Sequence, residues 1–91
     1  MIKIFYSILI IFSFLFVSEG YSQTSNEYFD SGWTKFKLND NYGAISDYNK
    51  SIELNPNSAI AHSNRGLAKI NIKDFKGAII DCSRSLSDFK L

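Results

Sequence analysis

Residues 40–47, DNYGAISD, recur 34 residues later as residues 74–81, DFKGAIID, and this repeated segment decides the fold. Five of its eight positions are identical. The same spacing matches three further pairs, which are Gly32 with Gly66, Lys35 with Lys69 and Ser51 with Ser85. Chance at ordinary composition would give about two matches over this length. Eight matches in one register therefore indicate an internal repeat.

Each repeat unit has the pattern of two helices. Apolar residues recur at helical spacing at positions 28, 29, 33 and 36 and, after a polar break at 39–41, at positions 45, 48 and 52. The second unit has its break at residues 73 and 74. Asp40 and Asp74 stand at the breaks, where a carboxylate can cap the next helix by accepting an unpaired N–H. We therefore predict an all-α fold with helices near 25–38, 41–54, 59–72 and 75–88.

Gly32 and Gly66 occupy the same place in the two first helices. A glycine inside a helix costs about 0.5–1 kcal/mol relative to alanine, so its recurrence needs a compensating gain. Close packing of two helices supplies that gain. We expect Gly32 to face Ala44 and Gly66 to face Ala78 on the second helix of each unit.

The 34-residue unit of two helices resembles the tetratricopeptide repeat family. The residues that carry the resemblance are Gly32, Ala44, Tyr48 and Pro56 in the first unit and Gly66 and Ala78 in the second. The resemblance implies repeats at residues 25–58 and 59–91, the second incomplete at its C-terminal end, stacked as a short right-handed α-solenoid. Cys82 replaces the family's aromatic residue, and Lys90 falls where proline closes the family's unit.

The sequence contains few candidate catalytic residues. His62 and Cys82 are the only candidates for a base and a nucleophile, and the resemblance places both in the packed space between helices, whereas a Cys-His enzyme needs an accessible thiolate. Asp47 and Asp81 are expected on the outer, solvated side of the second helices. No phosphate-binding glycine loop, HExxH pattern or metal-ligand cluster occurs in the sequence. We predict a protein that is not an enzyme and has no cofactor or metal.

The first 22 residues have the pattern of a secretory signal peptide. Every residue from 4 to 17 is apolar except Ser7 and Ser13, and Lys3 precedes this run. As a helix the run would reach only about 21 Å, short of the roughly 30 Å hydrocarbon core. Small residues at positions 18, 20 and 22 favour cleavage after Ser22 and hence export to the periplasm or the medium. An uncleaved membrane anchor is the alternative.

Charge and cysteine content narrow the possible partners. Removal of residues 1–22 would take away Lys3 and Glu19 and leave nine basic against eight acidic residues, scattered along the chain. Binding of nucleic acid needs clustered cations, so we expect that the protein does not bind nucleic acid. Contact with a membrane is expected only if the apolar segment is retained. Cys82 is the only cysteine, so an internal disulfide is excluded.

The family resemblance implies a protein or peptide partner, bound on the concave side formed by the first helices. The residues at the binding positions are Phe29, Trp33, Phe36, Ser63, Leu67 and Ile70, with Asn26, Lys37 and Asn71 at the rim. Phe29 and Trp33 stand where the carboxylate-clamp subgroup has lysine and asparagine, which argues against a clamp for a charged C-terminus. The alternative is that Trp33 and Phe36 pack against the neighbouring repeat.

Three functions fit these patterns. The leading one is an exported protein-interaction module that serves as a scaffold or adaptor. The others are a membrane-anchored structural subunit of a complex and a fragment of a longer repeat protein. Two repeats bury little surface, so part of the apolar row at Phe75, Ile79, Leu86 and Phe89 is expected to remain uncovered and to dock another copy or a partner.

We predict that the mature protein starts at or near Gln23, because the apolar run is too short to span a bilayer and small residues precede that position. Intact-mass analysis of the exported protein checks this. A mass that includes residues 1–22, found in the membrane fraction, would instead establish the anchor.

Overall fold

The computed structural model describes residues 23–88, and this part of the chain is entirely helical apart from short connections. Its helices are α2 (Ser25–Lys37), α3 (Asn41–Leu54), α4 (Ala59–Asn71) and α5 (Phe75–Asp88). The bounds agree with the expected ranges to within one residue, and no strand occurs in residues 23–88. The predicted signal segment lies outside the described residues.

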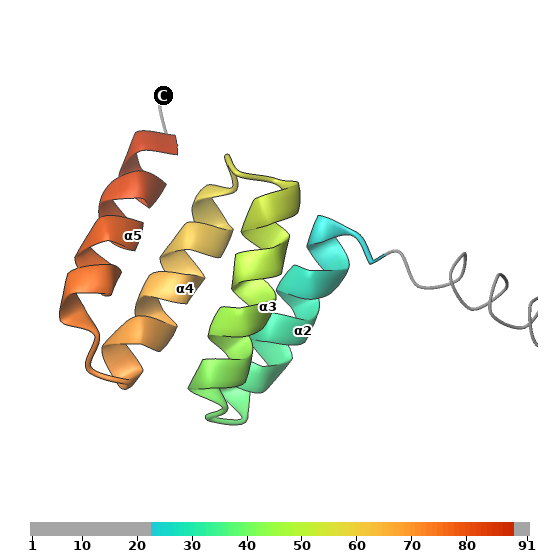
Figure 1. The fold of residues 1–91 in the computed structure, drawn as a ribbon, viewed down its shortest axis with the longest axis horizontal. Coiled ribbons are helices and arrows are strands. Elements are labelled where there is room, and N and C mark those ends of the chain that lie inside the picture. The colour runs from blue at the N-terminus through green and yellow to red at the C-terminus, as the bar shows by residue number, and fades with distance from the viewer. Residues whose placement is uncertain (1–22, 89–91) are drawn as a thin grey trace, which may run out of the picture.

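The helices lie side by side in the order of the sequence (Figure 1). The most extensive packing joins α2 to α3 and α4 to α5, and α3 packs on α4 to connect the two pairs. Among the described helices, α5 forms one end of the row and α2 lies at the other end, beside α3. This is the stacked arrangement of helix pairs that the sequence repeat predicts.

The repeat is visible in the helix ends. Asp40 Oδ1 accepts from the Gly43 N–H at 3.0 Å, and Asp74 Oδ1 accepts from the Gly77 N–H at 3.0 Å, which confirms both predicted caps. The residue before each cap has a left-handed backbone, with φ of 64° at Asn39 and 65° at Lys73. Identical turns at equivalent places give both helix pairs the same reversal of direction.

Small side chains allow the helices to approach closely. Ala44 and Ala68 are fully buried, and with Tyr48 they form the core, against which Phe29, Phe36 and Ile45 pack. Tyr48 is the largest of the fully buried side chains. Its ring centroid lies 5.7 Å from that of Phe29, in a tilted arrangement. The core is therefore centred on the first helix pair and its contact with α4.

The partner of Gly32 differs from the expected one. A Cβ atom at Gly32 would lie 2.8 Å from the Tyr48 ring, so the glycine accommodates this aromatic side chain and not Ala44. At Gly66 a Cβ atom would lie 3.3 Å from Asp81 Cβ, 3.4 Å from Cys82 Sγ and 3.5 Å from the Ala78 carbonyl oxygen. The expected approach to Ala78 is thus present. The first unit is tighter because tyrosine is larger than cysteine.

The prediction that Asp47 and Asp81 are solvated was wrong. Asp81 is 1% exposed, and its carboxylate receives hydrogen bonds from Arg65 Nε and Nη2 at 2.9 and 2.7 Å. Lys69 Nζ lies 3.0 Å from the same carboxylate. These cations come from α4, so Asp81 of α5 faces the neighbouring helix and not the solvent. Sequence periodicity gives the face of a helix but not which neighbour covers it.

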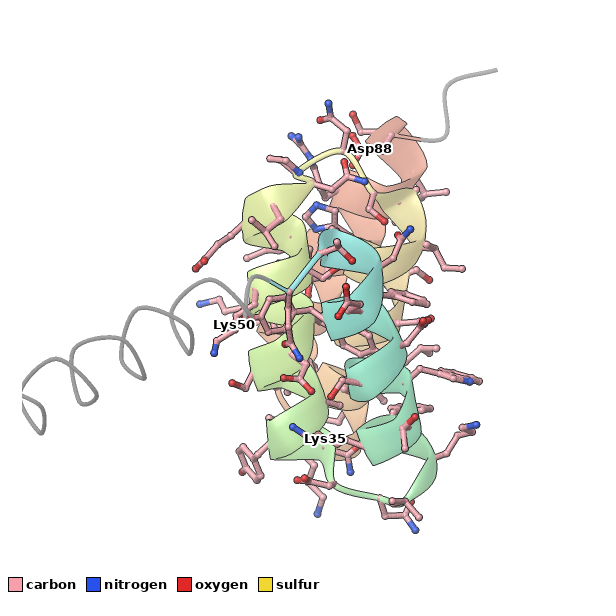
Figure 2. All side chains as sticks on the ribbon, turned by 90° about the vertical axis from the view of Figure 1, so that its right-hand side faces the viewer. Lys35, Lys50 and Asp88 are labelled. Atoms are coloured by element: carbon pink, nitrogen blue, oxygen red, sulfur yellow. The ribbon has the colours of Figure 1, made fainter. Side chains whose placement is uncertain are left out.

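The first unit has a weaker version of the same arrangement. Ser31 Oγ donates to Asp47 Oδ2 at 2.6 Å, and Lys35 Nζ lies 2.9 Å from that oxygen. Lys35 reaches from α2 to α3 and is labelled in Figure 2. Ser31 and Lys35 are the repeat equivalents of Arg65 and Lys69. In each unit, two residues of the first helix thus bind a buried carboxylate on the second helix.

The surrounding groups keep both carboxylates ionised. Burial by itself would raise the pKa of Asp81, but hydrogen bonds and positive charge from Arg65 and Lys69 outweigh it and hold the pKa below its usual value of 3.8. Asp47 also has a lowered pKa, because Ser31 and Lys35 outweigh the effect of its burial. Folding therefore favours the ionised form of each aspartate.

We predict that Gly32→Ala destabilises the protein, whereas Gly66→Ala is close to neutral. The new methyl group at Gly32 would overlap the buried Tyr48 ring, at a cost of about 1–3 kcal/mol that exceeds the gain in helix propensity. At Gly66 the contacts are tight but not overlapping, and the propensity gain offsets them. Urea unfolding of both variants provides the comparison, and equal stabilities would contradict the packing described for Tyr48.

We predict that stability falls as the pH drops below about 3.8 and that Asp81→Asn flattens this dependence. A pKa lowered in the folded state stabilises the protein fully above the unfolded-state pKa, and this contribution disappears as the pH falls through the folded-state pKa. At pH 7, Asp81→Asn should cost about 3 kcal/mol. Asp47→Asn should cost less, because the Lys35 side chain is 41% exposed. Thermal melts between pH 2 and pH 7 test both statements.

Candidate functional site

The residues predicted for partner binding divide into two groups by exposure. Trp33 is 40% exposed, and Leu67 and Ile70 are exposed to a similar degree on α4. Phe29, Phe36 and Ser63 are half-buried. Phe29 and Phe36 support the core, since both pack against the cluster around Tyr48. The accessible predicted residues are therefore Trp33, Leu67 and Ile70, and Ile60 of α4, which was not predicted, adds further exposed apolar surface.

A hollow of about 220 Å³ joins the first helices of the two units. We call it the α2–α4 hollow, and it is lined by Phe29, Trp33, Ile60 and Asn64. Two of the predicted residues, Phe29 and Trp33, thus meet two others from α4. Ile60 and Asn64 were not predicted as binding residues, although they lie one helical turn apart and Asn64 directly follows the predicted Ser63.

The predicted Ile70 belongs to a different surface. It lines a second hollow, of about 350 Å³, together with residues of α5. Asn71, expected at the rim of the concave surface, donates from Nδ2 to Asn41 Oδ1 at 3.0 Å and so joins α4 to α3. The C-terminal part of α4 therefore contributes to the stacking of the helices and to the α5 side of the molecule.

Aromatic stacking fixes the orientation of Trp33. Its ring lies parallel to that of Phe36, with the centroids 5.7 Å apart. Lys37 Nζ lies 5.7 Å from the Trp33 ring centroid. The indole is thus held by an aromatic neighbour and a cation while part of it remains accessible. A partly exposed aromatic side chain with a fixed orientation can bind apolar groups at a small entropic cost.

Tyr48 connects the hollow to the core. Its ring packs between Gly32 and Phe29, and Phe29 in turn lines the α2–α4 hollow. Burial raises the pKa of the Tyr48 hydroxyl, and the negative charge of Asp47 acts in the same direction. The phenol therefore stays neutral at physiological pH, as a packed core residue should.

His62 and Cys82 have different environments. His62 is buried as expected, and its Nε2 lies 2.9 Å from the Pro56 carbonyl oxygen. Cys82 was expected to be packed between helices but is exposed. Its Sγ lies at the edge of α4, beside Gly66, and also lines a hollow formed with Ile70 of α4. Within those residues there is also no group of three or more His, Cys, Asp or Glu side chains arranged to hold a metal ion.

The described helices are too short or too polar to cross a bilayer, a finding that concerns residues 23–88 alone. The apolar run at residues 4–17 is outside that range.

Residues 32–71 match a protein-family model described as a TPR repeat. The matched segment runs from Gly32 in α2, through α3, to the end of α4. No curated protein and no solved structure matches the chain. Together with the four stacked helices, the match shows that this part of the chain is similar to a tetratricopeptide repeat. Domains of this kind are typically non-catalytic and bind proteins or peptides, which indicates a protein-interaction module.

Proposed function

We propose that the protein is an exported interaction module that holds a partner protein or peptide in the α2–α4 hollow and has no enzymatic activity. The observation that carries this proposal is the accessible, oriented Trp33 ring at a hollow lined by residues of two repeat units. Trp is among the residues that most often dominate binding energy at protein interfaces.

The exposure pattern supports a binding role for Trp33. A residue that served only to pack the two units together would be buried, as Tyr48 is. Trp33 is instead 40% exposed, although it stacks on the half-buried Phe36. We therefore assign Phe36 to the support of the core and Trp33 to contact with the partner. Phe29 serves both, since it touches Tyr48 and lines the hollow.

The chemistry of the hollow defines the ligand. Phe29, Trp33 and Ile60 offer apolar surface, and Asn64 supplies an amide that can donate to and accept from a peptide backbone. Lys37 provides a cation beside Trp33. A ligand with one or two large apolar side chains fits this arrangement best. A charged C-terminus does not, because the α2–α4 hollow is lined by no cationic side chain.

Export is proposed from the sequence of the N-terminal segment. Lys3, the apolar run at 4–17 and the small residues before Gln23 support it. A retained segment would make the protein a membrane-anchored subunit with the same interaction surface. The binding proposal is independent of this choice, because the α2–α4 hollow is built from residues beyond the segment.

We predict that Trp33→Ala weakens partner binding at least about 30-fold without lowering the melting temperature appreciably. Loss of an interfacial hot spot costs about 2 kcal/mol or more, and every 1.4 kcal/mol is a factor of ten in affinity. Partners recovered by crosslinking in the native host supply the ligand for the binding measurement.

Two variants serve as controls. Tyr42→Ala removes a highly exposed aromatic side chain of α3 that does not line the hollow, and should leave both properties unchanged. Phe36→Ala should lower the melting temperature, because Phe36 packs on the core. If Trp33→Ala behaves like Phe36→Ala, Trp33 belongs to the core and the proposed site is wrong.

A further inference from the structure

The end of the helix row at α5 carries a second apolar hollow. The α5 hollow has a volume of about 350 Å³, and its main lining residues are Phe75, Ala78, Ile79, Cys82 and Leu86 on α5 and Ile70 on α4. Phe75, Ile79 and Leu86 are exposed, as the sequence predicted for this row, whereas Phe89 lies outside the described residues. The hollow is separate from Trp33 and from the α2–α4 hollow.

The repeat shows what kind of element covers such a surface. Shifted back by 34 residues, the α5 positions of the hollow correspond on α3 to Asn41, Ala44, Ile45, Tyr48 and Ile52. On α3 this region faces α4, the first helix of the next unit. Several contacts hold α4 there, including a hydrogen bond from Arg65 to Asn49, and two others involve Ala68 and Asn71. Ala68 packs in the cluster with Ala44 and Tyr48, and Asn71 donates to Asn41.

The α5 residues differ from their α3 equivalents at both of these contacts. Cys82 replaces Tyr48, so the space that an aromatic ring fills beside Ala68 is open on α5. Phe75 replaces Asn41, so the polar contact that Asn71 makes has no counterpart. A helix lying on α5 as α4 lies on α3 therefore needs a large apolar side chain at each of these two places.

We propose that the α5 hollow binds an amphipathic helix of a partner protein, laid on α5 as α4 is laid on α3. The partner helix carries bulky apolar residues, such as leucine, at the positions where α4 has Ala68 and Asn71. This surface would give the protein a second interaction, independent of the one proposed for the α2–α4 hollow. Repeat units stack through such helix-on-helix contacts, and helix-in-groove binding uses the same geometry between chains.

A second copy of the chain is a poor occupant. Head-to-tail stacking would place α2 on α5, and the α2 residues equivalent to Ala68 and Asn71 are Thr34 and Lys37. Both are exposed, and neither can fill an apolar hollow. If two copies paired through their α5 helices, the hollow of one copy would face the hollow of the other, and neither copy would supply a side chain to fill it. The polar outer face of α2 thus disfavours self-assembly, while the apolar face of α5 accepts a different helix.

The test uses peptide probes made from the chain's own α4. A fluorescein-labelled peptide of residues 57–73 with Ala68→Leu and Asn71→Leu should bind the full chain at least about tenfold more tightly than the unmodified peptide, because the added methylenes bury apolar area. A peptide of residues 23–39, which contains α2, should bind most weakly. Fluorescence anisotropy measures all three affinities. Equal affinities for the three peptides would overturn the proposal.

Adjacent isoleucines of α5 provide a matched pair of variants. Ile79 is 67% exposed and lines the hollow, while Ile80 is 66% exposed and does not. Ile79→Ser should weaken binding of the doubly substituted peptide at least about tenfold, and Ile80→Ser and Trp33→Ala should leave it unchanged. Both serine variants should keep the wild-type melting temperature, since neither residue is in the core.

Two further readouts locate the bound helix. The exposed Cys82 thiol should react readily with a maleimide in the free protein, and the bound peptide should slow that reaction. If Cys82 reacts equally fast with and without saturating peptide, the peptide binds elsewhere and the proposal fails. Sedimentation experiments test whether a second copy is the occupant. If the wild-type chain dimerises and Ile79→Ser makes it monomeric, a second copy fills the hollow and the proposal of a partner helix is overturned.

Discussion

The interaction on which the rest of the structure depends is the buried carboxylate between the two helices of each unit. Asp81 lies between α4 and α5 and is held by Arg65 and Lys69, and Asp47 lies between α2 and α3 and is held by Ser31 and Lys35. An uncompensated charge in this position would be costly. Each helix pair must therefore keep the register in which the carboxylate meets its donors.

This register determines which faces of the helices remain available. With the carboxylates directed into the pairs, Gly32 and Tyr48 pack together and Phe29 is held at the edge of the core. Trp33 then lies outside the core, beside Ile60 and Asn64 of the next unit. The hollow proposed for partner binding is thus a consequence of how the two helix pairs stack, with rigid helices on both sides.

The two ends of the helix row have different chemistry. At the α2 end Lys50 Nζ lies 5.4 Å from the Tyr28 ring centroid, and the Lys50 side chain is labelled in Figure 2 near the start of the helical region. A charged residue thus covers an aromatic one there. At the α5 end the surface that lines the α5 hollow is apolar and accessible. The proposed second interaction therefore concerns the α5 end of the described helices.

The sequence by itself determined the helices, their caps and the repeat. Apolar spacing and capping by Asp40 and Asp74 are local properties, set by contacts within a few residues of the chain, so they could be predicted. Two of the residues that line the α2–α4 hollow, Phe29 and Trp33, stand at positions where the family resemblance implies contact with a partner, and their binding role stays a prediction. Ile60 and Asn64 were missed, since their meeting with α2 depends on how the units stack.

Only the tertiary structure decided which side chains are covered. Asp81 and Cys82 are adjacent in the sequence, yet the aspartate that was expected in solvent is buried and the cysteine that was expected in the core is exposed. The covering of a helical residue depends on the neighbouring helix and on the groups that this helix supplies. For Asp81 these are the two cations of α4, whereas Cys82 lies beside the small Gly66 of α4 and stays exposed at the α5 hollow. The apolar periodicity of one helix does not predict which groups of a neighbouring helix cover these two side chains.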